Sequence, residues 1–205
     1  FAARGYAVKL SGQNIRIAFA LITDAKKGIV LDQARNIELD GNKFWRLRED
    51  GIIASRTVNA QFDDNAFSEF LPRKTQCALP GGVIEGLAKR DCPGVWTDGN
   101  HADGIQMRNG VVNVRIRRNT VEGDLQGGIG QYDTTGDAPL GRILIEGNRV
   151  RVTGFNSITL DECIGCRIER NLAWRGNPAR RVPIRPGKAT TCGNEVEGEK
   201  PDALC

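Results

Sequence analysis

The sequence contains one histidine, one methionine and few aromatic residues, which make up 6% of its 205 positions. It has no apolar run near the roughly 18 residues that a membrane-spanning helix requires, so we predict no membrane span. It has only one Cys-x-x-Cys motif, at 163–166. A zinc site would therefore need ligands that are nearly all thiolates and that no second motif supplies. The single histidine therefore argues against a histidine-rich metal centre.

Glycine and cysteine are well represented. Glycine occupies 25 of 205 positions, against ordinary usage of about 7%, and predicts many turns. Six cysteines form an even set, which favours disulfides and a secreted or periplasmic location. Because the chain opens on Phe1 without a methionine or a signal-peptide pattern, we expect that a leader was removed or that this is a fragment of a larger protein.

Charge is mild and mixed along the chain. The net charge is +4, from 29 basic and 25 acidic residues, which suits an acidic partner without requiring one. Acidic residues such as Glu146 and Glu169 interleave with the arginines, so we predict a solvated surface and no nucleic-acid binding. With 40% hydrophobic residues, the chain can form one domain over 1–205.

A repeat of about 23 residues runs through most of the chain. Short Gly-Ile-type runs begin at 28, 51, 104, 128 and 157, and each is followed by an alternating run that ends in asparagine. These asparagines fall at 42, 65, 119, 148, 171 and 194, so that successive differences are 23, 54, 29, 23 and 23. Each unit has short strands of period two and no helical periodicity. Such a unit cannot bury its own apolar face, but stacked units can.

Stacking predicts which side chains lie above one another. The expected inward columns are Ile29, Ile52, Ile105, Ile129 and Ile158, and then Ile37, Ala60, Val114, Ile143 and Arg167 or Ile168. The terminal asparagines should adopt the left-handed conformation in a tight turn and bond to the asparagines above and below. The repeated glycines should mark a corner at which each coil turns.

The repeat resembles the right-handed parallel β-helix proteins of the pectate-lyase-like group, which includes polysaccharide lyases and uronate epimerases. The pattern Asp-Gly-Ile-x-x occurs at 103–107 and is followed by Asn-x-x-Ile-x-x-Asn-x-x at 113–121. The resemblance covers about residues 14–198. It implies an all-β, right-handed parallel β-helix (solenoid) of about seven to eight coils, in which the Gly-Ile strands form the face that binds polysaccharide.

Two departures from the period flank that face. The longer insertion covers about 70–100 and the shorter one about 133–140. A long loop in a compact chain is typically functional, and a Cys77–Cys92 bridge would close the longer one. Outward side chains of the later Gly-Ile strands form a polar strip, with successive coils about 4.8 Å apart. The residues predicted to bind the substrate are Trp96, Gln106, Asp133, Asp161 and Arg185.

The strip and the insertions bring together residues suited to cleave an acidic, uronate-containing polysaccharide by β-elimination. That reaction needs a cation for the carboxylate, a base for the C5 proton and an acid for the leaving oxygen. We predict that the catalytic residues are His101, Arg108 and Tyr132, with Arg108 or His101 as base and Tyr132 as acid.

Asp98 and Asp103 are candidate ligands for Ca²⁺, and no other cofactor is predicted. Asp103 also recurs as Asp50 at the same place of another coil, which favours a role in capping a turn. Alternatives left open are a uronate C5-epimerase, a glycoside hydrolase, and a non-catalytic carbohydrate-binding or structural β-solenoid.

Overall fold

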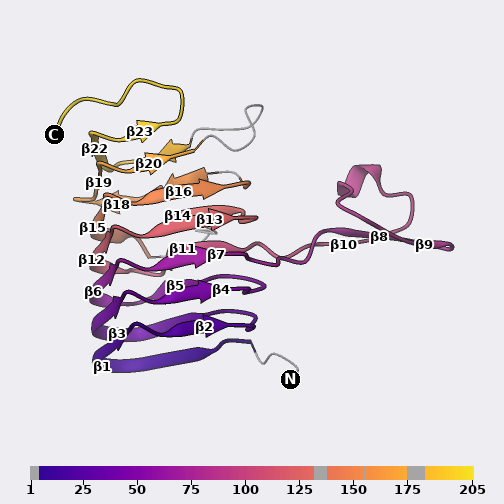
Figure 1. Cartoon of the computed structure of the whole chain (residues 1–205), viewed down its shortest axis with the longest axis horizontal. Helices are drawn as coiled ribbons and strands as arrows, with labels where there is room; N and C mark the ends of the chain where they lie inside the picture. Colours follow the sequence, from indigo (N-terminus) through magenta and orange to yellow (C-terminus); the bar gives the residue numbers. More distant parts are fainter. Residues whose placement is uncertain (1–4, 132–137, 155, 175–182) are drawn as a thin grey trace.

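Short strands stack in register every 23 residues or so, and the chain winds into a parallel β-helix (Figure 1). The computed structural model describes residues 5–131, 138–154, 156–174 and 183–205. Over these residues the chain makes seven coils, each with strands on up to three faces. The predicted fold class and period are confirmed.

Each coil contributes strands to three faces. Face 1 contains the first halves of β1 (Val8–Ala18) and β3 (Ile29–Asp40), followed by β5 (Ile52–Ser55), β11 (Asp103–Arg108), β14 (Gly127–Gln131), β17 (Asn156–Thr159) and β21 (Ile184–Arg185). Face 2 contains the second halves of β1 and β3, followed by β6 (Val58–Asp63), β12 (Val112–Arg117), β15 (Leu140–Glu146), β18 (Cys163–Ile164), β19 (Arg167–Glu169) and β22 (Thr190–Cys192).

Face 3 is a separate sheet. It contains β2 (Leu21–Thr23), β4 (Lys43–Trp45), β7 (Ala66–Ser68), β13 (Thr120–Gly123), β16 (Arg149–Val152), β20 (Leu172–Ala173) and β23 (Glu195–Val196). Because β1 and β3 run unbroken around the corner between faces 1 and 2, those two faces form one 13-stranded sheet.

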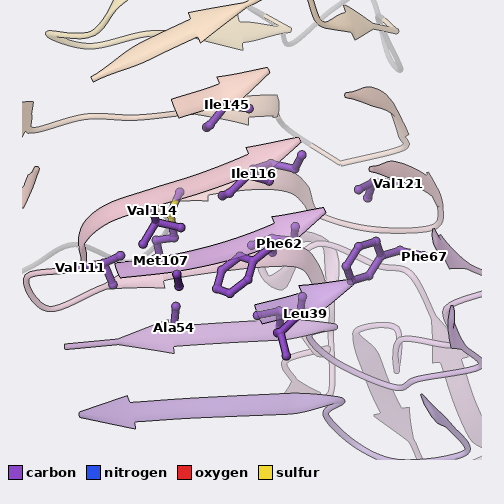
Figure 2. Close-up of a cluster of buried hydrophobic side chains, with 14 of the residues drawn as sticks. Leu39, Ala54, Phe62, Phe67, Met107, Val111, Val114, Ile116, Val121 and Ile145 are labelled. Atoms are coloured by element: carbon purple, nitrogen blue, oxygen red, sulfur yellow. The ribbon is translucent and has the colours of Figure 1, made fainter. Parts of the chain in front are cut away.

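The inward columns are nearly those predicted. The five isoleucines of the first column are paired in register and fully buried. In the second column Cys166, and not Arg167 or Ile168, lies beside Ile143, since Leu144 pairs with Arg167. Inside the coils, Phe44 and Phe67 stack with ring centroids 4.5 Å apart, and Figure 2 shows Phe62 and Met107 in the same core.

A ladder of buried asparagines fixes the corner between faces 2 and 3. Asn42, Asn65, Asn119, Asn148, Asn171 and Asn194 are all at most 3% exposed. The side-chain amide of each donates to the Oδ1 of the next, at 2.9–3.0 Å, from Asn42 through Asn194. The prediction that these amides bond from coil to coil is therefore confirmed.

The buried asparagines do not adopt the left-handed conformation that the sequence predicts for them. The residue before each buried asparagine has a positive φ, as in Asp64 (56°) and Arg118 (54°), whereas the buried asparagines do not. A second, exposed set, Asn14, Asn36, Asn59 and Asn113, is left-handed at the corner between faces 1 and 2 and has its own amide ladder. The exposed set thus combines the two roles that the sequence assigned to the buried set, and the buried set keeps only the amide ladder.

The repeated glycines serve close packing rather than a left-handed turn. Gly28, Gly51, Gly104 and Gly128 do not have positive φ. A Cβ on Gly51 would lie 2.6 Å from the Gly104 carbonyl oxygen and 2.6 Å from the Phe67 ring. Side chains of face 3 lie against all four glycines and leave no room for a Cβ there. They are Phe44, Phe67, Val121 and Val150.

This packing predicts a strong effect for Gly128→Ala. The added Cβ would lie 2.2 Å from both the Ser157 oxygen and Val150 Cγ1, and overpacking of this kind costs about 1–3 kcal/mol. We expect a loss of about 3 kcal/mol in the free energy of unfolding, measured by urea denaturation. Gly81→Ala is the matched control, since nothing lies within 4 Å of its Cβ; equal midpoints for the two variants would contradict this explanation.

The longer insertion forms a small antiparallel sheet that projects from the solenoid between coils 3 and 4 (Figure 1). It consists of β8 (Gln76–Leu79), β9 (Gly82–Glu85), the 3₁₀ turn η1 (Lys89–Asp91) and β10 (Val95–Thr97). A Cys77–Cys92 disulfide closes it, as the sequence suggested. The shorter insertion falls largely on 132–137, outside the described residues.

The last coil ends in a cap. Residues 197–205 cross its open edge and are held by a Cys192–Cys205 disulfide. Asn194 donates from its backbone and side-chain nitrogens to the Asp202 carboxylate. Asp202 therefore takes the place that an asparagine of an eighth coil would occupy.

Candidate functional site

A polar groove runs along the outside of face 1, from coil 2 to coil 7. Its cavity measures about 710 Å³. Among the described residues, all the side chains that line it are polar or charged, and Gly99 adds backbone only. The lining residues are Lys27, Glu49, Asp50, Gly99, Asn100, His101, Asp103, Gln106, Arg108, Gln126, Gln131, Asn156, Thr159, Asp161 and Arg185. We call this the face 1 groove.

The floor of the groove follows the strand register. Gln106 stacks on Gly130, Gly130 on Thr159, and Thr159 on Arg185. Gln106 and Thr159 are 9% and 2% exposed. Thr159 Oγ1 is buried and has no hydrogen-bond partner, and the same is true of Gln126 Oε1. Unpaired buried polar atoms are rare in folded proteins, and these two have almost no solvent-accessible surface of their own in the groove.

Two stacked carboxyl groups lie on the side of the groove where the strands begin. Asp50 Oδ1 accepts a hydrogen bond from the Asp103 backbone N–H at 3.1 Å, and the Asp103 carboxyl accepts one from the Gly127 N–H. Lys27 Nζ lies 3.4 Å from Asp50 Oδ2. The turn-capping role expected for Asp103 and Asp50 is therefore present.

Burial changes the proton affinity of both carboxyl groups. Burial first, and then the charge of Asp50, raises the pKa of Asp103 to about 8. Burial also raises the pKa of Asp50, although Lys27 opposes this. Asp103 consequently holds a proton at neutral pH and presents a proton donor to the groove.

His101 lies on the same side as Asp103, two residues before it in the segment that leads from the insertion into β11. Its side chain is 65% exposed, and its Nε2 lies 3.7 Å from Asp98 Oδ2. An imidazole is the side chain best suited to exchange protons near neutral pH. His101 and Asp103 thus line the same groove.

Arg108 lies on the opposite side of the groove, at the end of β11. Five residue steps separate it from Asp103, which is about 16 Å in a strand. Asp161 is nearby in coil 6 and forms an ion pair with Arg185, with Oδ1 and Nη2 3.0 Å apart. His101 and Arg108 therefore line one groove from opposite sides. Tyr132 and Asp133 lie outside the described residues.

Trp96 lies in the projecting insertion. Its indole Nε1 donates to the Leu87 carbonyl oxygen at 3.0 Å, and Lys89 lies over its ring at 6.0 Å. The described residues that line the face 1 groove do not include it. Its predicted contact with substrate remains a prediction, and in the structure it anchors the segment carrying η1.

Hydrolysis by Asp103 and Asp161 does not fit the register. Asp103 stacks with Asn156 two coils on, and Asp161 comes five residues after Asn156. The two positions are thus about 16 Å apart along the strands and about 10 Å apart across them. Inverting hydrolases need carboxyl groups within about 9.5 Å. Asp103 and Asp161 therefore do not form the carboxyl pair of a hydrolase.

The residues at Asp98 and Asp103 fit a Ca²⁺ ion poorly. One Asp98 oxygen accepts from the Gly99 N–H at 2.8 Å, and Asp103 is buried and protonated near neutrality. Among the described residues, the group of ligand-type side chains close enough to share an ion is Glu169, Cys192 and Cys205, and these two cysteines form a disulfide.

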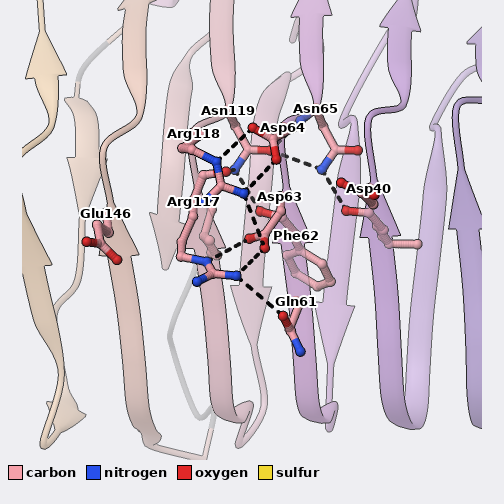
Figure 3. Close-up of polar contacts among 12 residues, drawn as sticks. Asp40, Gln61, Phe62, Asp63, Asp64, Asn65, Arg117, Arg118, Asn119 and Glu146 are labelled. Atoms are coloured by element: carbon pink, nitrogen blue, oxygen red, sulfur yellow. Dashed lines mark hydrogen bonds and ion pairs between the residues drawn. The ribbon is translucent and has the colours of Figure 1, made fainter.

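Several arginines on face 2 and at its end pair with carboxylates. Figure 3 shows Arg117 with Asp63 and Arg118 with Asp64 on adjacent coils. The hydrogen bond from Arg118 lowers the pKa of Asp64. Arg170 pairs in the same way with Glu146. This face is a charge-balanced surface away from the groove.

Sequence reasoning missed several groove residues. They are Lys27, Glu49, Asn100, Gln126, Gln131 and Asn156. Lys27 and Asp50 each directly precede a repeated glycine, as Asp103 does, so the repeat register places all three on one edge. Gln131 carries no such signal: its Oε1 accepts from the Asp161 and Glu162 backbones, which only the structure reveals.

No protein-family model matches this chain, and no curated protein matches its sequence. Similar solved structures include PfbA, a surface adhesin of Streptococcus pneumoniae, at 13% identity and a TM-score of 0.47 over 92% of this chain. The chain covers 58% of that adhesin chain. An alginate lyase from Paenibacillus sp. str. FPU-7 is similar at 14% identity and a TM-score of 0.40, over 98% of this chain and 75% of that one. Both likenesses are distant.

Proposed function

We propose that the face 1 groove binds an acidic polysaccharide and that the protein cleaves it by β-elimination. The observation that carries this proposal is the buried carboxyl group of Asp103, whose pKa burial raises to about 8, in the same groove as His101. The described side chains that line this groove are all polar or charged. Sugar hydroxyls would find hydrogen-bond partners in the amide side chains that line the groove, such as Asn100 and Gln126. Cations in the groove would attract the uronate carboxylate.

In this mechanism His101 is the base and Asp103 is the acid. The imidazole takes the C5 proton of a uronate, and the electrons of that C–H bond form the C4–C5 double bond. The C4–O bond breaks, and the leaving oxygen takes the proton of Asp103. Solvent then returns a proton to Asp103 and removes one from His101. Arg108 as base with Tyr132 as acid is the alternative pairing, from the other side of the groove.

The test follows unsaturated product by its ultraviolet absorbance on a panel of uronate polymers. We expect Asp103→Asn and His101→Ala each to lower the rate at least 100-fold, which is the usual contribution of general acid–base catalysis. Arg115→Ala, on the exposed outer side of face 2, is the control and should keep full activity. Loss on Arg108→Ala with retention on His101→Ala would favour the alternative pairing.

Other outcomes identify other functions. New reducing ends without the unsaturated product would indicate hydrolysis, and altered C5 configuration without cleavage would indicate an epimerase. Binding without any reaction would overturn the catalytic proposal and favour a non-catalytic binding or structural solenoid.

Three disulfides, Cys77–Cys92, Cys163–Cys166 and Cys192–Cys205, support the proposal that the protein works outside the cytoplasm. Disulfides persist in oxidising compartments, where extracellular polysaccharides are also found. In the described part of the chain, no helix has the length and apolar character needed to cross a membrane.

A further inference from the structure

We propose that the polysaccharide bound by the face 1 groove alternates a uronate with a neutral sugar, and is not a polymer of uronates alone. This inference rests on the proposed function. It follows from the charges of the groove, which are sparse, spaced and largely balanced by carboxylates within the groove itself.

Among the residues that the structure describes, the cations that line the groove are widely spaced along the solenoid axis. Lys27 lies just before β3 in coil 2, Arg108 is the last residue of β11 in coil 4, and Arg185 lies in β21 of coil 7. With about 4.8 Å between coils, these positions are roughly 10 and 14 Å apart along the axis. Each interval exceeds the length of one pyranose unit. A chain lying along the groove would meet a cation at intervals and not at every sugar.

Carboxylates accompany the cations at both ends of the groove. Lys27 Nζ lies 3.5 Å from Glu49 Oε2 and 3.4 Å from Asp50 Oδ2. Arg185 is paired with Asp161 at 3.0 Å, which leaves further guanidinium N–H groups for one ligand carboxylate. A uronate on every sugar would bring negative charge against Glu49 and Asp161, and like charges at short range disfavour binding.

The floor between the cations is neutral and capable of hydrogen bonding. Gln106, Gly130 and Thr159 form one column across coils 4 to 6. Gln106 and Thr159 line the groove and carry no charge, and they are 9% and 2% exposed. Hydroxyl and amide groups of neutral sugars match such partners, whereas a carboxylate would find no cation in the column until Arg185. The groove therefore offers alternate neutral and cationic contacts.

The experiment compares two classes of polymer at matched chain length and ionic strength. Hyaluronan and unsulfated chondroitin alternate a uronate with a neutral sugar, and polygalacturonate and alginate carry a uronate at every position. We expect the alternating polymers to bind at least 10-fold more tightly, measured by calorimetry, and to give the faster release of unsaturated product. Equal or tighter binding of the uronate homopolymers, with cleavage, would overturn this inference while the proposed function stands. Absence of binding to all four would overturn both.

A charge variant tests the cause of the preference. Asp161→Asn removes the carboxylate beside Arg185, and we expect it to reduce the preference for alternating polymers about 5-fold by improving the binding of homopolymers. Glu162→Gln is the matched control, because this neighbouring carboxylate is 71% exposed and does not line the groove. Glu49→Gln provides an independent second variant. A preference unchanged in both Asp161→Asn and Glu49→Gln would contradict the electrostatic explanation.

Discussion

Replacing Asn119 by alanine should destabilise the fold by about 5 kcal/mol. Its Oδ1 accepts from the backbone and side-chain nitrogens of Asn65, and its Nδ2 donates to the Phe62 carbonyl and to Asn148 Oδ1, all within 3.0 Å. Alanine leaves these partners buried and unpaired, at about 1–3 kcal/mol for each group that finds no substitute. Urea denaturation should show the loss as a much lower midpoint.

Asn113→Gly is the control for this prediction. Asn113 belongs to the exposed ladder, donates to Asn59 Oδ1 at 2.7 Å and has a φ of 57°, which glycine adopts without strain. Water replaces the lost hydrogen bond there, so we expect a cost below about 1 kcal/mol. Similar costs for the two variants would show that burial of the ladder does not matter.

Asp103→Asn should stabilise the protein at pH 8 and change its pH dependence. The pKa of Asp103 is about 8 in the folded state against 3.8 ordinarily, so between these values the folded state holds a proton that the unfolded state releases. The free energy of unfolding consequently falls as the pH rises from about 4 to about 8. An amide keeps the shape and carries no charge to desolvate.

The expected gain at pH 8 is up to about 6 kcal/mol, since each unit of pKa difference corresponds to about 1.4 kcal/mol. At pH 4, variant and parent should differ little. Thermal unfolding between pH 4 and pH 9 measures this, with the exposed Asp91→Asn as control. A parent protein whose stability rises from pH 4 to pH 8 would refute the assignment. Greater stability combined with lost activity would mark Asp103 as a functional group.

The sequence alone predicts the coil and its inward columns because a fixed period places residue n over residue n + 23. It predicts the buried amide ladder for the same reason. It does not separate Asn42 from Asn36, because both residues recur with the period, and only the backbone shows which asparagine is left-handed and which is buried. It also does not show whether the repeated glycines are needed for a turn or for close packing, since the side chains that crowd them come from face 3.

The candidate site is predictable where it follows the register and not elsewhere. Gln106, Arg108 and Asp161 lie outward along face 1 as expected. The distance between His101 and Arg108 depends on the width of a strand, which the repeat does not report. The raised pKa of Asp103 arises from burial beside Asp50, and a pattern of residue types carries no measure of burial.

The carboxylate of Asp202 gives the solenoid a terminus that is independent of its length. The side-chain amide of each buried asparagine donates a hydrogen bond to the asparagine of the next coil, and Asp202 accepts the last of these bonds. A coil duplicated anywhere within this series would find identical neighbours below and above and would leave the cap unchanged. Each added coil would lengthen the groove by about 4.8 Å. Under the proposed function, gene duplication could therefore change the length of the oligosaccharide that the groove binds, one coil at a time.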